Sequence, residues 1–347
     1  MKEPKEADFY HALNICHQAD YAALGKIKDR FGSWAKAWQS GAGRGTSPEK
    51  ASRELSALDI KLILREDDDF PSSLREIPHS PFGLYVLGRN LGPSDKPDKI
   101  VAIVGTRKAT PEGKALARQF AGKFAARGLV VVSGLALGID AAAHEGCFSE
   151  NGRTVAVMPG GLDRIYPRTN ETLARKIMDT GGVLISEYPP GMPILPYRFL
   201  ERNRIVSGLS RGVLIVEAGL RSGSLATARF AMEQNRDVFV LPGPVRHPNY
   251  KGSNLLIRAG AELVTEPEQI LEDWDLLPEE DKSAIRADDS RETVSILTVL
   301  LSSKSSLEID KIAELVKLDV QTTSQALSLL VLTDRINETP LGYSAKK

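Results

Sequence analysis

Residues 101–140 read VAIVGTRKATPEGKALARQFAGKFAARGLVVVSGLALGID. Two apolar runs, each ending in a glycine turn, flank a helical segment, which is the pattern of a strand–helix–strand unit. Glycine has no Cβ, so backbone N–H groups at such turns can approach a ligand. Neighbouring parallel strands bring the two turns into one crevice, where open α/β sheets bind their ligands. Because Arg107 follows the first turn, we expect an anionic ligand.

The same alternation of strand, turn and helix continues to residue 265. Continuous apolar runs indicate strands buried on both faces, as in a parallel sheet. Helices are expected to begin near Pro111, Asp140, Asn170, Ser224 and Ser253, and right-handed crossovers then give a doubly wound α/β domain with a mostly parallel sheet. The predicted strands are KIVAIVG (99–105), LVVVSG (129–134), TVAVMP (154–159), GVLIS (182–186), GVLIVEA (212–218), DVFVLPG (237–243) and AELVT (261–265).

The periodicity and composition divide the chain into five parts. Residues 1–65 have apolar positions at helical spacing and form a small helical domain, equally a structural appendage or a binding module. Residues 66–98 are a transitional segment and linker that contains one short strand, FGLYVLGR. The α/β core follows at 99–272, and an acidic linker at 273–290. Residues 291–347 carry three helical patterns and a strand or small wing, which suggests a winged-helix domain.

Charge is distributed unevenly, although the formal net charge is zero. Residues 101–265 hold 21 Lys and Arg against 13 Asp and Glu, whereas residues 266–347 hold 9 against 17. This favours an anion-binding core and a tail with another role, although chance segregation of surface charge gives the same pattern. Winged-helix domains usually place a basic helix on DNA. Residues 320–333 contain no Lys or Arg, so we favour protein contact or a structural role for the tail.

The composition, with 42% hydrophobic and 26% charged residues, is typical of a soluble globular protein. Cys16 and Cys147 lie far apart, so a disulfide framework is not expected, which fits a reducing cytoplasm. No apolar run approaches the ~18 residues of a membrane span, and the N-terminus has no apolar signal core. We therefore expect a cytoplasmic protein without membrane contact.

The glycine turns supply the first candidate binding residues. In GTR, the threonine offers a hydroxyl and the arginine a planar fork suited to phosphate. The turn SGLALGID is similar to a phosphate-binding turn, but it lacks GxGxxG spacing and a well-placed acid for a ribose hydroxyl, so no cofactor is expected. Asp140 in this turn is either a helix N-cap or a ligand contact. The candidates are Gly105, Thr106, Arg107, Ser133, Gly134 and Gly138.

Three later segments add further candidates. YPRTN offers an aromatic ring for base stacking, a cation and an amide, although the tyrosine is equally compatible with core packing. RNR places two guanidinium groups beside an amide as a phosphate or base clamp, but such arginines can instead hold a loop by pairing with acids such as Glu201 or Glu217. RSGS opens a helix whose free N–H groups bind anions. The candidates are Tyr166, Arg168, Asn170, Arg202, Asn203, Arg204, Ser222, Gly223 and Ser224.

Catalytic groups are scarce in this sequence. No Cys/His cluster has metal-ligand spacing, and neither a nucleophile elbow nor a phosphate-binding GxxxxGK[ST] loop is present. His144 lies within a predicted helix and His247 on a loop. Glu187 and Glu217 follow strands and could act as bases, but neither has an evident nucleophile partner. The residues therefore favour a binding protein over an enzyme.

Eight motifs, in order, resemble the DNA-processing protein A (DprA, also called Smf) family across about residues 80–270. The resemblance implies an extended Rossmann-like domain that binds single-stranded DNA without evident catalysis. The flanks are similar to the helical, SAM-like N-terminal domain and the winged-helix C-terminal domain of some members. The motifs are GTR, SGLALGIDAAAH, GGLDRIYPRTN, ISEYPPG, RNRIVSGLS, VEAGLRSGSLATA, DVFVLPG and GSNLLIRAGAELVT.

The resemblance also implies partners and a DNA pocket. Family members protect incoming single strands during natural transformation, help to load the RecA recombinase and typically form homodimers through the Rossmann-like domain. Their pocket uses the arginine of the GTR turn, here Arg107, a basic residue after Tyr-Pro, here Arg168, and the RNR segment, here residues 202–204. The chain departs from the pattern at Leu200, where members commonly have proline, so a less rigid loop entry is expected.

Two other functions remain as alternatives. Nucleoside-phosphate hydrolases similar to lysine decarboxylases share this general fold and carry a PGGxGTxxE signature. Here Pro159, Gly160 and Gly161 are followed by Leu162 and Asp163, and the glutamate of that signature is missing from its place. A winged-helix transcription regulator would bind duplex DNA through the C-terminal residues alone, which their acidity argues against.

Overall fold

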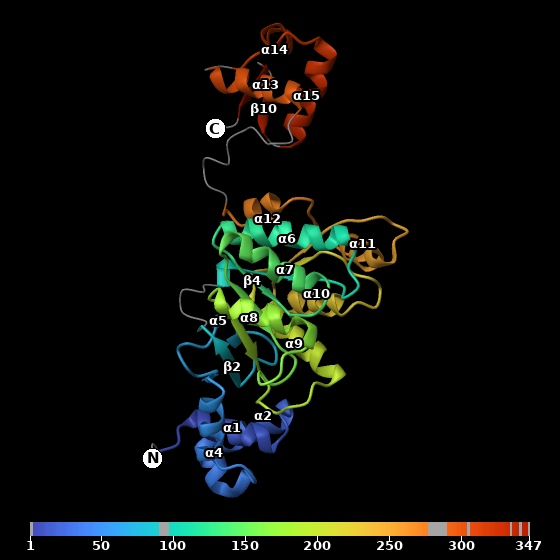
Figure 1. Cartoon of the computed structure of the whole chain (residues 1–347). Coiled ribbons are helices and arrows are strands. Elements are labelled where there is room, and N and C mark those ends of the chain that lie inside the picture. The colour runs from blue at the N-terminus through green and yellow to red at the C-terminus, as the bar shows by residue number, and fades with distance from the viewer. Residues whose placement is uncertain are drawn as a thin grey trace. The chain divides into compact units, whose positions relative to one another are not determined.

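The computed structural model has two compact units, Met1–Ile270 and Leu271–Lys347, each of which is described by itself (Figure 1). Parts of the two linkers predicted at 66–98 and 273–290 lie outside the described residues. The structure describes residues 3–89, 97–276, 290–303, 306–333, 335–339 and 342–345.

A nine-stranded sheet forms the centre of the first unit, in the order β1-β2-β6-β5-β4-β3-β7-β8-β9. The strands β3 to β9 pair in parallel and coincide with the seven predicted runs, which confirms the α/β, doubly wound, mostly parallel sheet. The strands are β1 (Ile60–Leu64), β2 (Gly83–Gly88), β3 (Ile100–Val104), β4 (Val130–Ser133), β5 (Thr154–Val157), β6 (Val183–Ser186), β7 (Gly212–Ile215), β8 (Asp237–Val240) and β9 (Glu262–Leu263).

The strand order reverses at β3, which lies between β4 and β7. Crossovers from β3 lead outward on one side, and the chain returns to the other side of β3 to form β7. This is the topological switch point of a doubly wound sheet, where the loops after two adjacent strands separate and leave a crevice. The crevice predicted from the glycine turns therefore lies at the switch point.

Two antiparallel strands extend the sheet beyond β6. β2 pairs with β6, and β1 pairs with β2. Leu84, Tyr85 and Val86 of β2 are fully buried, because this apolar run completes the sheet instead of connecting two domains. The boundary predicted at residue 65 thus falls between two paired strands, and contacts group the first 270 residues into one unit.

Helices cover the sheet, and helices also form the N-terminal part of the first unit. The helices of the described residues are α1 (Glu6–Cys16), α2 (Tyr21–Phe31), α3 (Trp34–Ala37), α4 (Pro48–Ala57), α5 (Ser72–Arg75), α6 (Pro111–Ala126), α7 (Ile139–Cys147), α8 (Glu171–Asp179), α9 (Pro196–Leu209), α10 (Gly223–Glu233), α11 (Lys251–Arg258), α12 (Pro267–Asp273), α13 (Arg291–Ser302), α14 (Ile309–Val316) and α15 (Val320–Leu332).

The core lies between these helices and both faces of the sheet. Successive side chains of a strand point to opposite faces. Ile100, Ala102 and Val104 of β3 belong to one buried cluster with residues of α9 and α10. On the other face, α6 and α7 pack side by side and contact β3 and β4, while α8 covers β5 and β6 (Figure 1). Burial on both faces explains why these strands read as continuous apolar runs.

The second unit contains α13, α14 and α15 around a buried cluster of its own. Two antiparallel strands, β10 (Ile336–Thr339) and β11 (Gly342–Ala345), follow α15, and Leu307 forms a bridge to Tyr343. This element order agrees with the predicted helical patterns, while the assignment to a winged-helix domain stays a prediction. Among the helices in the described part of the chain, none is long and apolar enough to cross a membrane.

Candidate functional site

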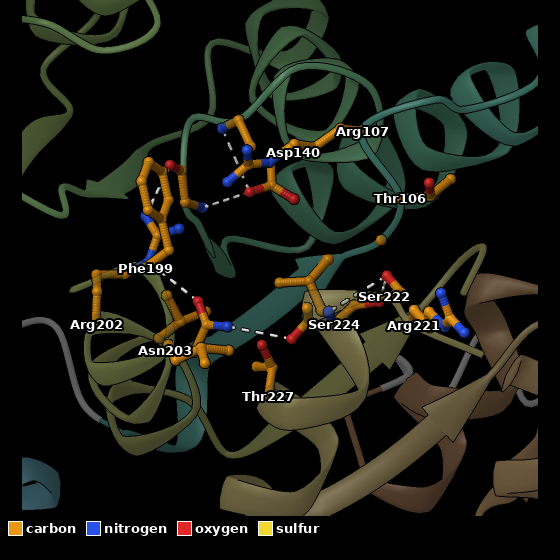
Figure 2. Close-up of a pocket in the computed structure, with 17 residues that line it drawn as sticks. Thr106, Arg107, Asp140, Phe199, Arg202, Asn203, Arg221, Ser222, Ser224 and Thr227 are labelled. Carbon is orange, nitrogen blue, oxygen red and sulfur yellow. Dashed lines mark hydrogen bonds between the residues drawn. The ribbon is translucent and has the colours of Figure 1, made fainter. Parts of the chain in front are cut away.

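A hollow of about 350 Å³ opens at the switch point, at the carboxyl ends of β3, β4 and β7. Figure 2 shows Arg107 and Asp140 on one side of it and Ser222 and Ser224 on the other. Nine of the fifteen predicted site residues line this hollow, although they come from four separate segments. These nine are Gly105, Thr106, Arg107, Gly134, Arg202, Asn203, Ser222, Gly223 and Ser224.

The turn after β3 is held tightly by its neighbours. The Thr106 N–H donates to the Glu217 carbonyl at 2.7 Å, and the Thr106 carbonyl accepts from the Ile139 N–H at 3.3 Å. A Cβ on Gly138, which has a φ of +85°, would lie 2.3 Å from the Thr106 carbonyl oxygen. Gly138 therefore serves the close contact between two loops and does not line the hollow.

The space beside two glycines is filled by other side chains of the same protein. A Cβ on Gly105 would lie 2.5 Å from the Ile139 side chain, and a Cβ on Gly134 would lie 2.4 Å from a guanidinium nitrogen of Arg202. The sequence predicts that these glycines let backbone N–H groups approach a ligand. In the folded chain they instead admit Ile139 and Arg202, because both side chains pack directly against the turns.

An exposed cation and an aromatic ring form one rim of the hollow. The Arg107 guanidinium lies 4.6 Å from the centroid of the Phe199 ring, and Phe199 contacts the Tyr166 ring edge-on at 5.6 Å. Tyr166 is 40% exposed, which places it at the surface and not in the core. Cation–π contact positions a guanidinium without neutralising its charge, so Arg107 can still pair with an anion.

Arg202 lines the hollow and is buried. One of its Nη atoms donates to the Gly134 carbonyl at 2.7 Å and to the Val157 carbonyl. Its Nε donates to the Asn203 side chain at 3.2 Å. Burial lowers the pKa of Arg202 to about 10, and Asp140 opposes that change. Arg202 thus stays a cation at neutral pH and joins the turn after β4 to the carboxyl end of β5.

Asp140 lies in the first turn of α7 beside Arg202. Its carboxylate accepts the N–H groups of Gly134 at 3.1 Å and Ala136 at 3.4 Å. Burial raises the pKa of this carboxyl group, while Arg202 and the two backbone donors act against the rise. Gly138, not Asp140, is the N-cap of α7. Asp140 therefore orders the β4 turn and also lines the hollow. It is not the helix N-cap, and the alternative of a ligand contact stays a prediction.

The start of α10 forms the opposite wall. Ser222 is the N-cap and accepts the Ser224 N–H at 3.4 Å, and the two hydroxyl groups lie 2.7 Å apart. Asn203 reaches across and donates to the Gly223 carbonyl at 3.2 Å (Figure 2). The N-terminus of a helix carries a partial positive charge, so anion binding at this wall stays a prediction. The Ser224 N–H, which was predicted to be free, instead donates to the Ser222 hydroxyl.

Arg204 does not line the hollow. It makes a bidentate ion pair with Glu187, with N–O distances of 2.9 and 2.5 Å. Burial alone lowers the pKa of Arg204, but Glu187 outweighs this effect and leaves the pKa raised. Both side chains line a separate cavity of about 770 Å³. The geometry matches the alternative reading, in which an arginine holds a loop through an acid.

The remaining predicted residues lie around the hollow. The Ser133 hydroxyl is buried and donates to the Ile103 carbonyl at 2.6 Å, and the Asn170 amide donates to the Leu135 carbonyl at 2.9 Å. Both support the β4 turn from behind. Arg168 is exposed beyond the hollow, in the segment that also carries Tyr166. Tyr166 extends the rim through its contact with Phe199, and neither residue lines the hollow.

One helix and several lining residues were not predicted from the sequence. The RNR segment lies inside α9, which begins at Pro196, so Leu200 sits within a helix and not at a loop entry. Phe199 and Arg221 also line the hollow. Proline at the first helical position was the available signal for α9, but buried arginines on its inner face obscured the apolar periodicity.

The groups that could act as bases are occupied. The buried Glu217 carboxylate accepts from the backbone and hydroxyl of Thr110, from Asn249 and from the Tyr250 hydroxyl. His144 is buried and bonded to Thr154 at 2.6 Å. Within the described ranges, no group of three or more His, Cys, Asp or Glu side chains is placed to hold a metal ion.

Comparisons with known proteins match the region that contains the hollow. The family model of DNA recombination-mediator protein A matches residues 61–275. Protein Smf of Escherichia coli K12 is 42% identical over 249 residues, which cover 70% of this chain and 67% of that protein. DNA processing protein DprA of Streptococcus pneumoniae R6 is 41% identical over 210 residues, which cover 60% of this chain and 72% of that protein.

Two solved structures are also similar. DNA processing protein A from Streptococcus pneumoniae superposes with a TM-score of 0.58 and 33% identity, covering 78% of this chain and 93% of that one. DNA processing protein A from Helicobacter pylori gives a TM-score of 0.55 and 31% identity, covering 62% and 94%. The Helicobacter structure was determined to describe a single-stranded DNA binding mode.

Proposed function

The chain belongs to the DNA recombination-mediator protein A family, and from this premise we propose that it binds single-stranded DNA at the switch-point hollow. The observation that carries the proposal is that an exposed guanidinium, Arg107, and the N-terminus of α10 line the same hollow from opposite sides. A phosphodiester placed between them is attracted by a cation on one side and by a helix N-terminus on the other.

The rim supplies the second requirement of single-strand binding, a surface for bases. The rings of Tyr166 and Phe199 meet edge-on, and the neighbouring Leu200 is 50% exposed. Bases stack on aromatic side chains with little sequence preference. We infer that phosphates face Arg107 and α10, while bases face Tyr166 and Phe199, and that Arg168 contributes a further phosphate contact.

We propose binding without catalysis. The carboxylate of Asp140 is held by two backbone N–H groups beside Arg202, and that of Glu217 is saturated by four donors. A general base needs a free lone pair within hydrogen-bond reach of its proton. We infer that neither carboxylate is placed as the base of a nucleoside-phosphate hydrolase, because Asp140 orders the β4 turn and Glu217 is not among the residues that line the hollow.

The family premise suggests the biological setting. We propose that the chain protects incoming single strands during natural transformation, helps to load RecA on them, acts in the cytoplasm and forms a homodimer through the Rossmann-like domain. The helical N-terminal residues are proposed to be a SAM-like domain. The second unit is proposed to be a winged-helix domain that contacts protein, since residues 320–333 lack cations.

A competition experiment tests the binding mode. The full chain is titrated with fluorescent oligo-dT, and unlabelled single-stranded or duplex DNA of equal length is added as competitor. We expect the single strand to compete far better, because base stacking needs unpaired bases. Equal competition by duplex would contradict the proposal and favour a duplex-binding regulator. Release of free base from a nucleoside monophosphate would instead establish the hydrolase.

The proposed RecA partnership has a separate test. RecA filament formation is followed on oligo-dT that is already covered by a single-strand-binding protein, with and without the full chain. We expect the chain to speed filament formation. If DNA binding is present but the filament rate is unchanged, the loading role is wrong while the binding function stands.

A further inference from the structure

The switch-point hollow continues into a second hollow, and we propose that this second hollow is a phosphate subsite for the next part of the same DNA strand. The second hollow has a volume of about 380 Å³ and shares Thr106, Arg221 and Ser222 with the first. The inference rests on the proposed function, because it takes the first hollow as the place where the strand is bound.

The lining of the second hollow selects an anion. Its two charged residues are Arg221 and Lys251, both exposed, and the other lining residues are neutral. Because no carboxylate is among these lining residues, neither cation is neutralised from within the hollow. Lysine and arginine side chains in this arrangement suit the phosphates of a nucleic-acid backbone, which carry one charge per nucleotide.

The second hollow has a fixed position relative to the first. The Asn249 side-chain amide donates to the Lys108 carbonyl at 2.8 Å and to the buried Glu217 carboxylate at 2.8 Å. A Cβ on Gly252 would lie 2.7 Å from the Ala218 carbonyl oxygen. These contacts tie the segment before α11 to the loop that carries Arg107, so a strand bound at both places meets a preformed surface.

Side chains, not helix amides, would hold the phosphate there. The N–H groups of Gly252 and Ser253, at the start of α11, already donate to the Ala218 carbonyl at 2.8 and 3.0 Å. Arg221 belongs to both hollows, whereas Lys251 lines only the second. Lys251 is therefore the residue whose removal reports on the second hollow alone.

The test compares Lys251→Ala with the unmodified chain on oligo-dT of about 4 and about 16 nucleotides, by fluorescence anisotropy over a range of NaCl concentrations. On the longer oligonucleotide we expect weaker binding and a salt slope that is shallower by about 0.7, the value of one single-strand phosphate contact. On the shorter one, which the first hollow accommodates, binding should be unchanged. Lys251→Arg should keep the slope of the unmodified chain.

Two controls separate the possible failures. Lys26→Ala removes an exposed lysine of α2 outside both hollows and should change neither affinity nor slope. If Lys251→Ala binds the longer oligonucleotide like the unmodified chain at every salt concentration, while Arg107→Ala is weakened, the second hollow is not a subsite. If Arg107→Ala is also unaffected, the proposed function of the first hollow fails as well.

Discussion

Arg202 is a buried cation whose partners come from distant parts of the chain. It donates to the carbonyl group of Gly134, directly after β4, and to that of Val157, the last residue of β5. Its charge also acts on Asp140 in α7. A guanidinium has five N–H donors in a planar fork, so it can serve several acceptors at once. The residue thus stabilises the loops that shape the hollow instead of contacting solvent.

We predict that Arg202→Met lowers the free energy of unfolding by about 3–5 kcal/mol. The substitution leaves Asp140 as a buried charge without its cation, and removing one partner of a buried pair has a cost of this size. The Gly134 and Val157 carbonyl groups also lose their donor. Urea unfolding followed by circular dichroism measures the change.

A matched substitution and a double variant complete that test. Arg107→Met removes an exposed arginine and should change the free energy of unfolding by less than about 0.5 kcal/mol. Asp140→Asn combined with Arg202→Met should be less destabilised than the sum of the single changes, because the uncompensated charge is gone. An Arg202→Met protein as stable as the unmodified chain would show that the buried contacts contribute little.

Part of the site could be predicted residue by residue, and part could not. Arg107 and the RSGS segment lie in the predicted hollow because their positions follow directly from the ends of strands. Arg202 and Arg204 lie two residues apart in α9, yet Arg202 faces the hollow and Arg204 faces Glu187. Gly134, a partner of Arg202, and Glu187, the partner of Arg204, lie 68 and 17 residues away in sequence. The local sequence therefore does not indicate which way each arginine points.

At the scale of elements, α7 is joined to β5 by His144. Its Nδ1 contacts the Thr154 hydroxyl, which donates its own hydrogen to the Val131 carbonyl at 2.7 Å. Thr154 must therefore accept from Nδ1–H, and the neutral ring keeps an unprotonated Nε2. That nitrogen is buried without a hydrogen-bond partner in the described structure. Burial, with a smaller effect of Arg202, lowers the pKa of His144 to about 3.

We predict that His144 makes the free energy of unfolding fall as the solution becomes more acidic. The unfolded chain binds a proton at His144 near pH 6.5, whereas the folded chain does so only near pH 3. Between these values the unfolded state holds more protons, so the free energy of unfolding falls as pH falls, by about 1.4 kcal/mol per pH unit. Its full contribution is present above pH 6.5.

Unfolding titrations between pH 6.5 and 4.5 measure this slope. His144→Gln removes the titrating ring, and its stability should depend on pH less steeply than that of the unmodified chain by about 1.4 kcal/mol per unit. His247→Gln, on the loop before α11, is the matched control. Identical slopes for His144→Gln and the unmodified chain would contradict the assignment of a buried neutral ring.

The elements themselves were predictable to different degrees. The seven parallel strands were found because strands buried on both faces are uniformly apolar. α9 was not, because Arg198, Arg202 and Arg204 occupy buried positions of that helix, and arginine is read from sequence as a surface residue. The attachment of β1 and β2 to the sheet is a long-range pairing that no local pattern encodes.

At the scale of the whole molecule, the change from a basic to an acidic composition near residue 265 lies close to the boundary of the two compact units at residue 270. The basic excess of residues 101–265 lies in the first unit, and most of the acidic excess of residues 266–347 falls in the second. Both hollows are built only from residues of the first unit. Like charges repel, so an acidic unit contributes little to holding phosphates.

We predict that a chain ending at residue 276 binds oligo-dT within about twofold of the full chain, a difference below about 0.5 kcal/mol. The residues that line both hollows are retained, and only the second unit beyond α12 is removed. Fluorescence anisotropy at matched salt concentrations measures the affinity. A loss of tenfold or more would show that the second unit takes part in DNA binding, against the expectation from its acidity.

The most direct measurement of the central claim is the salt dependence of oligo-dT binding by Arg107→Ala. Exposed Arg44→Ala, outside both hollows, is the control. We predict that Arg107→Ala weakens binding for every sequence alike and makes the slope of log affinity against log salt shallower by about 0.7, because one phosphate contact is lost. An Arg107→Ala protein with the affinity and slope of the unmodified chain would contradict the placement of single-stranded DNA in the switch-point hollow.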